Sequence, residues 1–264
     1  MEVRNVNERK VHVQEFSSQA GSMLIRAFRT LHTAYGLGVF SVLFLLFLPL
    51  LFIPVVFPQK HSLVGIFNRW WARAMFMLVG LPVKVEYRFK PDPRKQYIFC
   101  PNHSSYLDIP TAGLNRHNTI FVGKSEMSQI PLFGWMYRKL HITVDRTKLK
   151  SRYQTLVRSR LAIDEGKSLT IFPEGGIVTK DPPKPAAFKD GAFRLAIEKQ
   201  IPIVPVTIPF NWIILPDNEF LLHWGRVAIV FHEPVSTTGL QPEDIGNLKT
   251  RVYETIRREL SKYA

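Results

Sequence analysis

The feature that most constrains the fold is a long uncharged stretch near the N-terminus. From Thr30 to Gln59 the chain carries no Asp, Glu, Lys or Arg, and within this stretch residues 34–57 read AYGLGVFSVLFLLFLPLLFIPVVF. A helix of that length can cross a hydrocarbon core of roughly 30 Å, because each residue adds about 1.5 Å. Pro49 and Pro54 each remove a backbone hydrogen bond in its second half, so we expect a kink there.

A second apolar stretch follows at residues 63–82, with the sequence LVGIFNRWWARAMFMLVGLP. It places Trp70 and Trp71 between Arg69 and Arg73, a combination typical of the membrane interface, where the ring lies at headgroup depth and the cation reaches phosphate. We therefore predict that residues 23–82 form a two-helix membrane anchor, whose first helix enters the bilayer and whose second lies along its surface. One complete membrane span and a buried helix of a soluble protein are the alternatives.

The charge of the chain favours an anionic partner. Its 35 Lys and Arg residues exceed its 21 Asp and Glu residues, which gives a formal net charge of +14. A positive field of this size attracts phosphate groups. Because 46% of the residues are hydrophobic and no basic motif interleaved with aromatics marks a known module that reads a nucleic-acid groove, we expect an anionic membrane surface as partner and no nucleic acid.

The N-terminus and the cysteine content are compatible with the cytoplasmic side of the membrane. Residues 1–22 are polar and charged, without the apolar core of a secretory signal, and we expect them to form a surface arm. Cys100 is the only cysteine, so no intramolecular disulfide can form and the chain suits a reducing compartment. Basic residues flank the apolar stretch on both sides, so the positive-inside rule gives no orientation. We expect the domain that follows the anchor to lie on the cytoplasmic face.

From residue 83 onward, short apolar runs alternate with amphipathic segments, a pattern typical of α/β domains. We expect residues 83–264 to form one domain with a largely parallel central sheet flanked by helices. The expected strands are residues 83–87, 97–100, 119–122, 142–144, 168–172, 203–208 and 227–231, and the expected helices are residues 106–115, 131–140, 151–165, 189–200 and 243–262. In such a sheet, functional residues gather on the loops that leave the C-terminal ends of the strands.

The loop after the second expected strand carries a histidine and an aspartate five positions apart, His103 and Asp108, in the segment PNHSSYLDIP. If a helix begins near Ser104 or Ser105, the aspartate lies about one turn into it and the two side chains can meet. A carboxylate that accepts the proton of one ring nitrogen fixes the tautomer, so the other nitrogen can act as general base toward a substrate hydroxyl. Taken alone, the same pair is also consistent with a helix cap or a surface hydrogen bond.

A second motif, FPEGG at residues 172–176, follows another expected strand. Its proline and its glycines, Gly175 and Gly176, predict a tight exposed turn. Backbone N–H groups and the carboxylate of Glu174 can face a substrate from such a turn. An ordinary strand-to-loop turn has the same composition, so this motif alone does not identify a function.

Taken together, four segments resemble the lysophosphatidic acid acyltransferase family of glycerolipid acyltransferases, which share a His-x4-Asp motif. NHSSYLD resembles the first block of the family and residues 124–148 resemble the second, while FPEGG and IPIVPVTI (residues 201–208) are similar to the third and fourth. The four segments lie within residues 97–210 in the order and spacing of the family. The resemblance thus covers the centre of the chain.

The resemblance implies a membrane-bound enzyme that moves a fatty acyl group from acyl-CoA or acyl carrier protein to the hydroxyl of 1-acylglycerol-3-phosphate, giving phosphatidic acid. His103 would remove the hydroxyl proton while Asp108 orients the ring. The same resemblance implies transfer in one step, without a covalent acyl-enzyme, a metal or a cofactor beyond the acyl donor.

Further site residues follow from the matched blocks. By resemblance, Lys124 and the backbone at Phe133 and Gly134 would stabilise the oxyanion of the reaction. Arg146 would bind the acceptor phosphate, since a guanidinium can contact two phosphate oxygens at once. Glu174, Gly175 and Gly176 of the third block would line the substrate site.

The chain departs from the family in the third block, which commonly reads EGTRS, with the arginine as a second phosphate ligand. Here Gly176 and Ile177 follow Gly175. Either a nearby cation supplies the missing charge, with Lys180, Lys189 and Arg194 as candidates, or the acceptor is another lyso-lipid, such as an amino-acid lipid or a lysophospholipid. A non-catalytic lipid-binding protein of the same fold is a further alternative. A soluble thioester hydrolase is disfavoured by the absence of a G-x-S-x-G segment.

Overall fold

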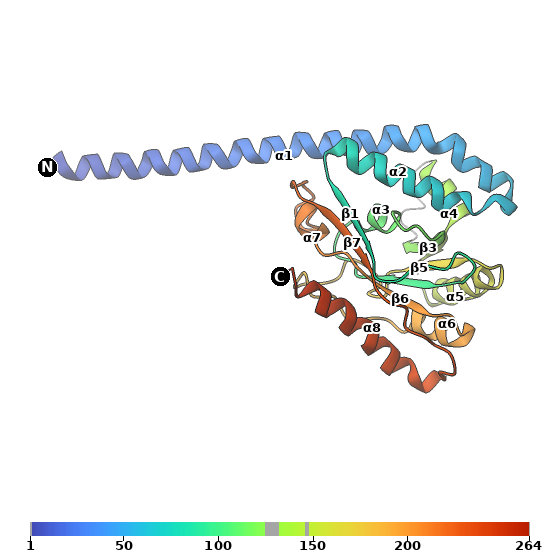
Figure 1. The fold of residues 1–264 in the computed structure, drawn as a ribbon. Helices are drawn as coiled ribbons and strands as arrows, with labels where there is room; N and C mark the ends of the chain where they lie inside the picture. The colour runs from blue at the N-terminus through green and yellow to red at the C-terminus, as the bar shows by residue number, and fades with distance from the viewer. Residues whose placement is uncertain (1, 125–131, 146–147, 264) are drawn as a thin grey trace.

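The structure is a computed structural model that describes residues 2–124, 132–145 and 148–263, with the backbone alone for residues 2–20, Lys124, Leu149 and Arg152. Across these residues the strands form one seven-stranded sheet in the order β1-β7-β6-β2-β5-β3-β4 (Figure 1). The strands are β1 (Val83–Tyr87), β2 (Ile98–Pro101), β3 (Thr119–Lys124), β4 (Ile142–Val144), β5 (Ser168–Ile171), β6 (Ile203–Thr207) and β7 (Val227–Phe231).

The sheet is largely parallel, as the sequence predicts. Among the described strands, one neighbouring pair is antiparallel: β6 pairs with β7 through Val206 with Phe231 and Thr207 with Val230. The other neighbours pair in parallel. The segment between β6 and β7 contains the short helix α7 (Asn211–Ile214) and turns the chain back at one end of the sheet instead of carrying it across a face.

Helices cover both faces of the sheet. Because alternate strand residues point to opposite faces, Ile98 of β2 packs with α5 (Leu149–Asp164), α6 (Gly191–Lys199) and α8 (Ile245–Leu260), which follows the 3-10 turn Pro242–Asp244. Its neighbour Phe99 packs on the other face with α1 (Glu2–Val56) and α2 (Leu63–Val79). The sheet therefore has a core on each side, and the N-terminal helices belong to one of them (Figure 1).

The two N-terminal helices lie side by side, joined by the 3-10 turn Pro58–Lys60, and α2 ends at Gly80, whose φ of 78° forms a left-handed cap. Helix α1 is continuous through the boundary expected at residues 22 and 23. Pro49 and Pro54 both lie inside it, and Figure 1 shows α1 bending over its last turns. The kink predicted from these prolines is therefore present.

Helix α1 exposes an unusually apolar surface. Within the described part of the chain, one segment, Gly21–Val56, is long and apolar enough to cross a membrane, and 22% of its most apolar window is buried in the protein. Leu24, Leu45 and Leu46 are among the large apolar side chains that face outward. A helix this exposed is not the buried core helix of a soluble protein. Helix α2 has 17 residues and is shorter than a typical span, so a surface position for it stays a prediction.

Candidate active site

The loop after β2 brings His103 and Asp108 together, as expected. The Nδ1 atom of His103 lies 3.0 Å from Oδ2 of Asp108. Since an ionised carboxylate only accepts hydrogen bonds, Nδ1 carries the ring proton and Nε2 keeps a free lone pair. The histidine is 9% exposed and the aspartate is fully buried. The imidazole is thus held in the tautomer that can accept a proton from a substrate.

The carboxylate of Asp108 also organises its own loop. Its Oδ2 accepts hydrogen bonds from the backbone N–H groups of Ser104 at 2.7 Å and Ser105 at 2.9 Å. Helix α3 (Asp108–Ala112) lies within the predicted residues 106–115 but is shorter, and it begins at the aspartate rather than near Ser104 or Ser105. The backbone before Asp108 turns around the carboxylate instead of entering the helix.

Asn211 completes the surroundings of Asp108. From the first turn of α7, its Nδ2 donates to Oδ1 of Asp108 and to Oγ1 of Thr111, each at 2.9 Å. This role of Asn211 was not predicted from the sequence. The available signal was its place shortly after the buried strand β6, beyond the C-terminal end of that strand.

The FPEGG turn holds the backbone of the histidine. The N–H of His103 donates to Oε1 of Glu174 at 2.6 Å, and the N–H of Ala186 donates to Oε2 at 2.7 Å. The His103 ring also stacks on Phe172, with centroids 4.2 Å apart. Glu174 is 1% exposed, and burial raises the pKa of its carboxyl to about 7, although the two backbone bonds act in the opposite direction.

These contacts correct the expectation that Glu174 faces a substrate. Both of its oxygens are directed at backbone N–H groups, so it positions His103 rather than binding a ligand. The expected tight turn is present, with φ of 82° at Gly175 and 152° at Gly176. Glycine at 175 is required because other residues rarely adopt that conformation.

The residues expected from the second block are described only in part. Arg146 lies outside the described residues, and Lys124 is described by its backbone at the end of β3. Gly134 is buried in the first turn of helix α4 (Phe133–Leu140), next to Phe133. The first N–H groups of a helix have no partner within it. The start of α4 therefore supplies backbone donors of the kind an oxyanion requires.

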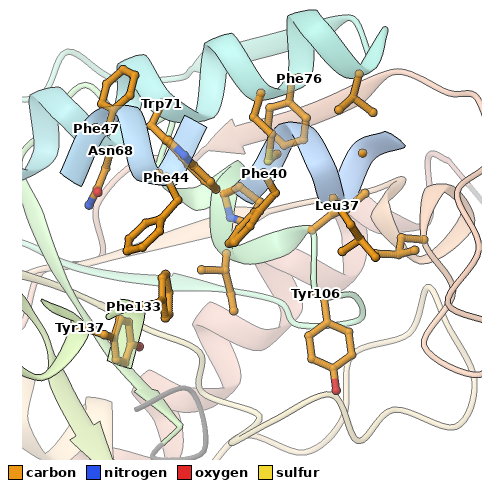
Figure 2. Close-up of a pocket in the computed structure, with 18 of the residues that line it drawn as sticks. Leu37, Phe40, Phe44, Phe47, Asn68, Trp71, Phe76, Tyr106, Phe133 and Tyr137 are labelled. Carbon is orange, nitrogen blue, oxygen red and sulfur yellow. The ribbon is translucent and has the colours of Figure 1, made fainter. Parts of the chain in front are cut away.

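An apolar cavity of about 400 Å³ adjoins this site (Figure 2). Its volume is in the range of ligand pockets. Figure 2 shows Tyr106 on one side of it and Phe133 and Tyr137 on the other, beneath α1 and α2. The segment that carries Asp108 contributes to its wall through Tyr106, Leu107, Ile109 and Pro110. The cavity therefore runs from the catalytic loop to the inner face of the N-terminal helices.

Metal ligands do not gather at this site or elsewhere in the described residues. No group of three or more His, Cys, Asp or Glu side chains in the described part of the chain is arranged to hold a metal ion.

The comparisons with known proteins agree with this geometry. The model of the family described as acyltransferase matches residues 83–209, which begin at β1 and include both motifs. The 1-acyl-sn-glycerol-3-phosphate acyltransferase of Haemophilus influenzae is 29% identical over 77% of this chain and 84% of its own length. Residues 83–209 thus match an acyltransferase domain. The resemblance stated from its motifs is confirmed.

Two further similar proteins are also named as acyltransferases. The lyso-ornithine lipid O-acyltransferase of Pseudomonas aeruginosa is 28% identical over 73% of this chain and 78% of its own length. A 1-acyl-sn-glycerol-3-phosphate acyltransferase of Chlamydomonas reinhardtii is 32% identical over 54% of this chain, which spans 43% of that longer protein.

The acyltransferase also shares its fold with a solved structure. The 1-acyl-sn-glycerophosphate acyltransferase PlsC of Thermotoga maritima superimposes with a TM-score of 0.70 at 21% identity, over 89% of this chain and 97% of that one. Residues 83–264 make up a smaller share of the chain than the 89% that superimposes. The match therefore also includes a large part of the N-terminal helices.

Proposed function

We propose that this acyltransferase moves a fatty acyl group from a thioester to the free hydroxyl of 1-acylglycerol-3-phosphate, giving phosphatidic acid. The observation that carries the proposal is a buried imidazole, fixed by Asp108 through Nδ1, beside a cavity of apolar side chains. The names of relatives from a bacterium, an alga and yeast point to the same acceptor.

The arrangement supports a direct transfer. Nε2 of His103 takes the proton of the acceptor hydroxyl as its oxygen attacks the thioester carbonyl carbon, and Asp108 stabilises the imidazolium that forms. The new ester bond forms and the carbon–sulfur bond breaks. The departing thiolate then receives the proton from the imidazolium, so the histidine returns to its starting state without a covalent acyl-enzyme.

The tetrahedral intermediate carries a negative charge that needs donors aimed at its oxygen. The N–H groups at Phe133 and Gly134, at the start of α4, and the ammonium of Lys124 are the groups we assign to this task. Phe133 lines the cavity, so the start of α4 lies at the wall that an acyl chain would occupy. Arg146 is the residue we assign to the acceptor phosphate.

The cavity suits an alkyl chain. Its wall is made of apolar and aromatic side chains from α1, α2, α3 and α4, with few polar groups. Each methylene that leaves water for such a surface contributes about 0.8 kcal/mol. We assign the cavity to the fatty acyl group, with acyl-CoA or acyl carrier protein as donor.

We further propose that α1 and α2 hold the enzyme in the membrane, with the catalytic domain on the cytoplasmic face. The outward apolar side chains of α1 support membrane contact, and the net charge of +14 favours an anionic lipid surface. The acceptor can then reach His103 without leaving the bilayer.

A second candidate is the acylation of a lyso-amino-acid lipid. Two observations favour it: Ile177 stands where the family commonly has a phosphate-binding arginine, and the Pseudomonas aeruginosa relative is named for lyso-ornithine lipid. Such an acceptor lacks the phosphate that this arginine binds.

A panel of acceptors separates the two candidates. Purified enzyme in detergent is given labelled acyl-CoA or acyl carrier protein with 1-acylglycerol-3-phosphate, lyso-ornithine lipid or lysophosphatidylcholine. We expect the highest kcat/KM with 1-acylglycerol-3-phosphate. A preference of tenfold or more for lyso-ornithine lipid would establish the second candidate in its place.

A further inference from the structure

The segment after the FPEGG turn folds back onto it. Thr179 Oγ1 donates to the carbonyl of Lys184 at 2.6 Å, which closes the loop on itself. The loop then returns to the turn through two backbone bonds: Ala186 N–H to Glu174 at 2.7 Å and Lys189 N–H to the carbonyl of Pro173 at 2.8 Å. Lys189 is thereby fixed beside the turn that supports His103.

The aliphatic stem of Lys189 lies directly against Gly175. A Cβ atom added to this glycine would lie 3.5 Å from Cγ and 3.8 Å from Cε of the lysine, which is ordinary van der Waals contact. Gly175 has φ of 82° and no side chain, so no side chain at position 175 lies between the lysine stem and the turn. The side chain is thus positioned along its length while its end reaches solvent.

The ammonium of Lys189 is available to a ligand. The residue is exposed, and none of the described carboxylates lies within ion-pair distance of it. The adjacent Asp190 pairs with Lys249 at 2.7 Å, and Glu174 of the FPEGG turn accepts two backbone N–H groups. A positive charge beside the catalytic turn is therefore unneutralised among the described residues.

We propose that Lys189 binds the phosphate of the acceptor, in place of the arginine that the family commonly carries at the position of Ile177. The inference rests on the proposed function. Glu174 links the two parts of the site, because it holds the His103 backbone through Oε1 and belongs to the same turn that Lys189 covers. Lys189 therefore places a cation beside the turn that supports the catalytic histidine.

The chemistry of lysine determines how Lys189 can bind a phosphate in place of an arginine. An ammonium is a point charge with three donors, whereas a guanidinium contacts two phosphate oxygens in a fixed plane. Lys189 therefore supplies attraction to an anionic headgroup with less geometric selectivity. We expect its removal to raise KM for a phosphate-bearing acceptor about 10-fold to 100-fold, the range of a hydrogen bond to a charged group.

The test compares Lys189→Met with Lys184→Met, which removes a second exposed lysine from the same loop. Both are assayed with 1-acylglycerol-3-phosphate and with its phosphate-free counterpart, 1-acylglycerol. Lys189→Met is expected to raise KM for the phosphate-bearing acceptor with little change in kcat, and to leave 1-acylglycerol unaffected. Lys184→Met is expected to match the unmodified enzyme on both. Equal KM values in the two variants would overturn the inference while the proposed function stands.

A second variant tests whether the rise in KM depends on a cation that binds the phosphate. Adding Ile177→Arg to Lys189→Met restores the family's cation and is expected to bring KM for 1-acylglycerol-3-phosphate back to within about threefold of the original value, a difference of under 1 kcal/mol. An unrestored KM in a variant with unchanged thermal unfolding would overturn the inference. An unmodified enzyme that acylates lyso-ornithine lipid and not 1-acylglycerol-3-phosphate would overturn the proposed function itself, and the inference with it.

Discussion

The backbone N–H of His103 donates to the carboxylate of Glu174 at 2.6 Å, across 71 residues of sequence. This bond joins the loop after β2 to the turn after β5, two neighbouring parallel strands whose C-terminal ends meet at one edge of the sheet. Asp108 fixes the ring of the same histidine from the other side. The imidazole is therefore held through both its backbone and its side chain.

The buried carboxyl of Glu174 predicts a pH-dependent stability. Its pKa is about 7 in the folded protein, against an ordinary value of 4.5. The folded state therefore holds the proton more tightly, so the free energy of unfolding falls as pH rises from about 4.5 to about 7, by about 3 kcal/mol, and levels off above. Thermal unfolding in detergent between pH 5 and 8 measures this fall. Glu174→Gln cannot titrate and should lack it; the same fall in that variant would contradict the assignment to Glu174.

Asn211 predicts a positioning effect on the catalytic pair. Asn211→Ala removes a hydrogen bond to the Asp108 carboxylate, and we expect kcat to fall about 10-fold. Asn211→Asp places a second buried carboxylate beside Asp108, so the two cannot both stay ionised and the loss in kcat should be larger. Steady-state kinetics on folded protein checks the order of the two variants. An Asn211→Asp enzyme with full kcat would show that the Asp108 environment does not matter for turnover.

The cavity predicts chain-length selectivity. Met75 on α2 lines the cavity and is 5% exposed, whereas Met77 on the same helix is 74% exposed. Met75→Trp shortens the space for an alkyl chain, so the preferred donor should shift to shorter acyl groups. We expect kcat/KM to fall about fourfold for each methylene that the cavity no longer holds. Met77→Trp is the control and should keep the original profile. For both variants, kcat/KM is measured with donors of increasing chain length. Identical profiles in the two variants would show that the cavity does not bind the acyl chain.

Membrane attachment through α1 can be tested with leucines of known exposure. Leu45→Asp/Leu46→Asp places two charges on the outward face of α1, at a cost of about 2.5–3.5 kcal/mol each near the centre of a span. The protein should then partition out of phospholipid vesicles. Leu161→Asp on α5, exposed at 55%, is the matched control and should stay bound. Retention of the double variant on vesicles to the same extent would exclude α1 as the anchor.

The sequence predicts the sheet well, because most of its strands are short apolar runs that need no distant information. The strands Val83–Tyr87, Ile142–Val144 and Val227–Phe231 match the expected residues. The helix after His103 was predicted with too early a start, since periodicity does not show that the Asp108 carboxylate accepts the N–H groups before it.

The candidate site was predictable where its residues follow strands and share a motif. The contact of His103 with Asp108 is local, so spacing was sufficient to predict it. The roles of Glu174 and Asn211 depend on partners 71 and 103 residues away, and the cavity lies between α1 and α2 on one side and α3 and α4 on the other. Such relationships arise only when the fold brings these segments together.

The most direct test of the account is the rate of acyl transfer by His103→Ala. The variant is purified in detergent and assayed with labelled acyl donor and 1-acylglycerol-3-phosphate, at equal amounts of folded protein as judged by thermal unfolding. Loss of the general base is expected to lower kcat by at least about 100-fold. A His103→Ala enzyme that transfers acyl groups at the original rate would contradict the account and favour a lipid-binding role for the fold.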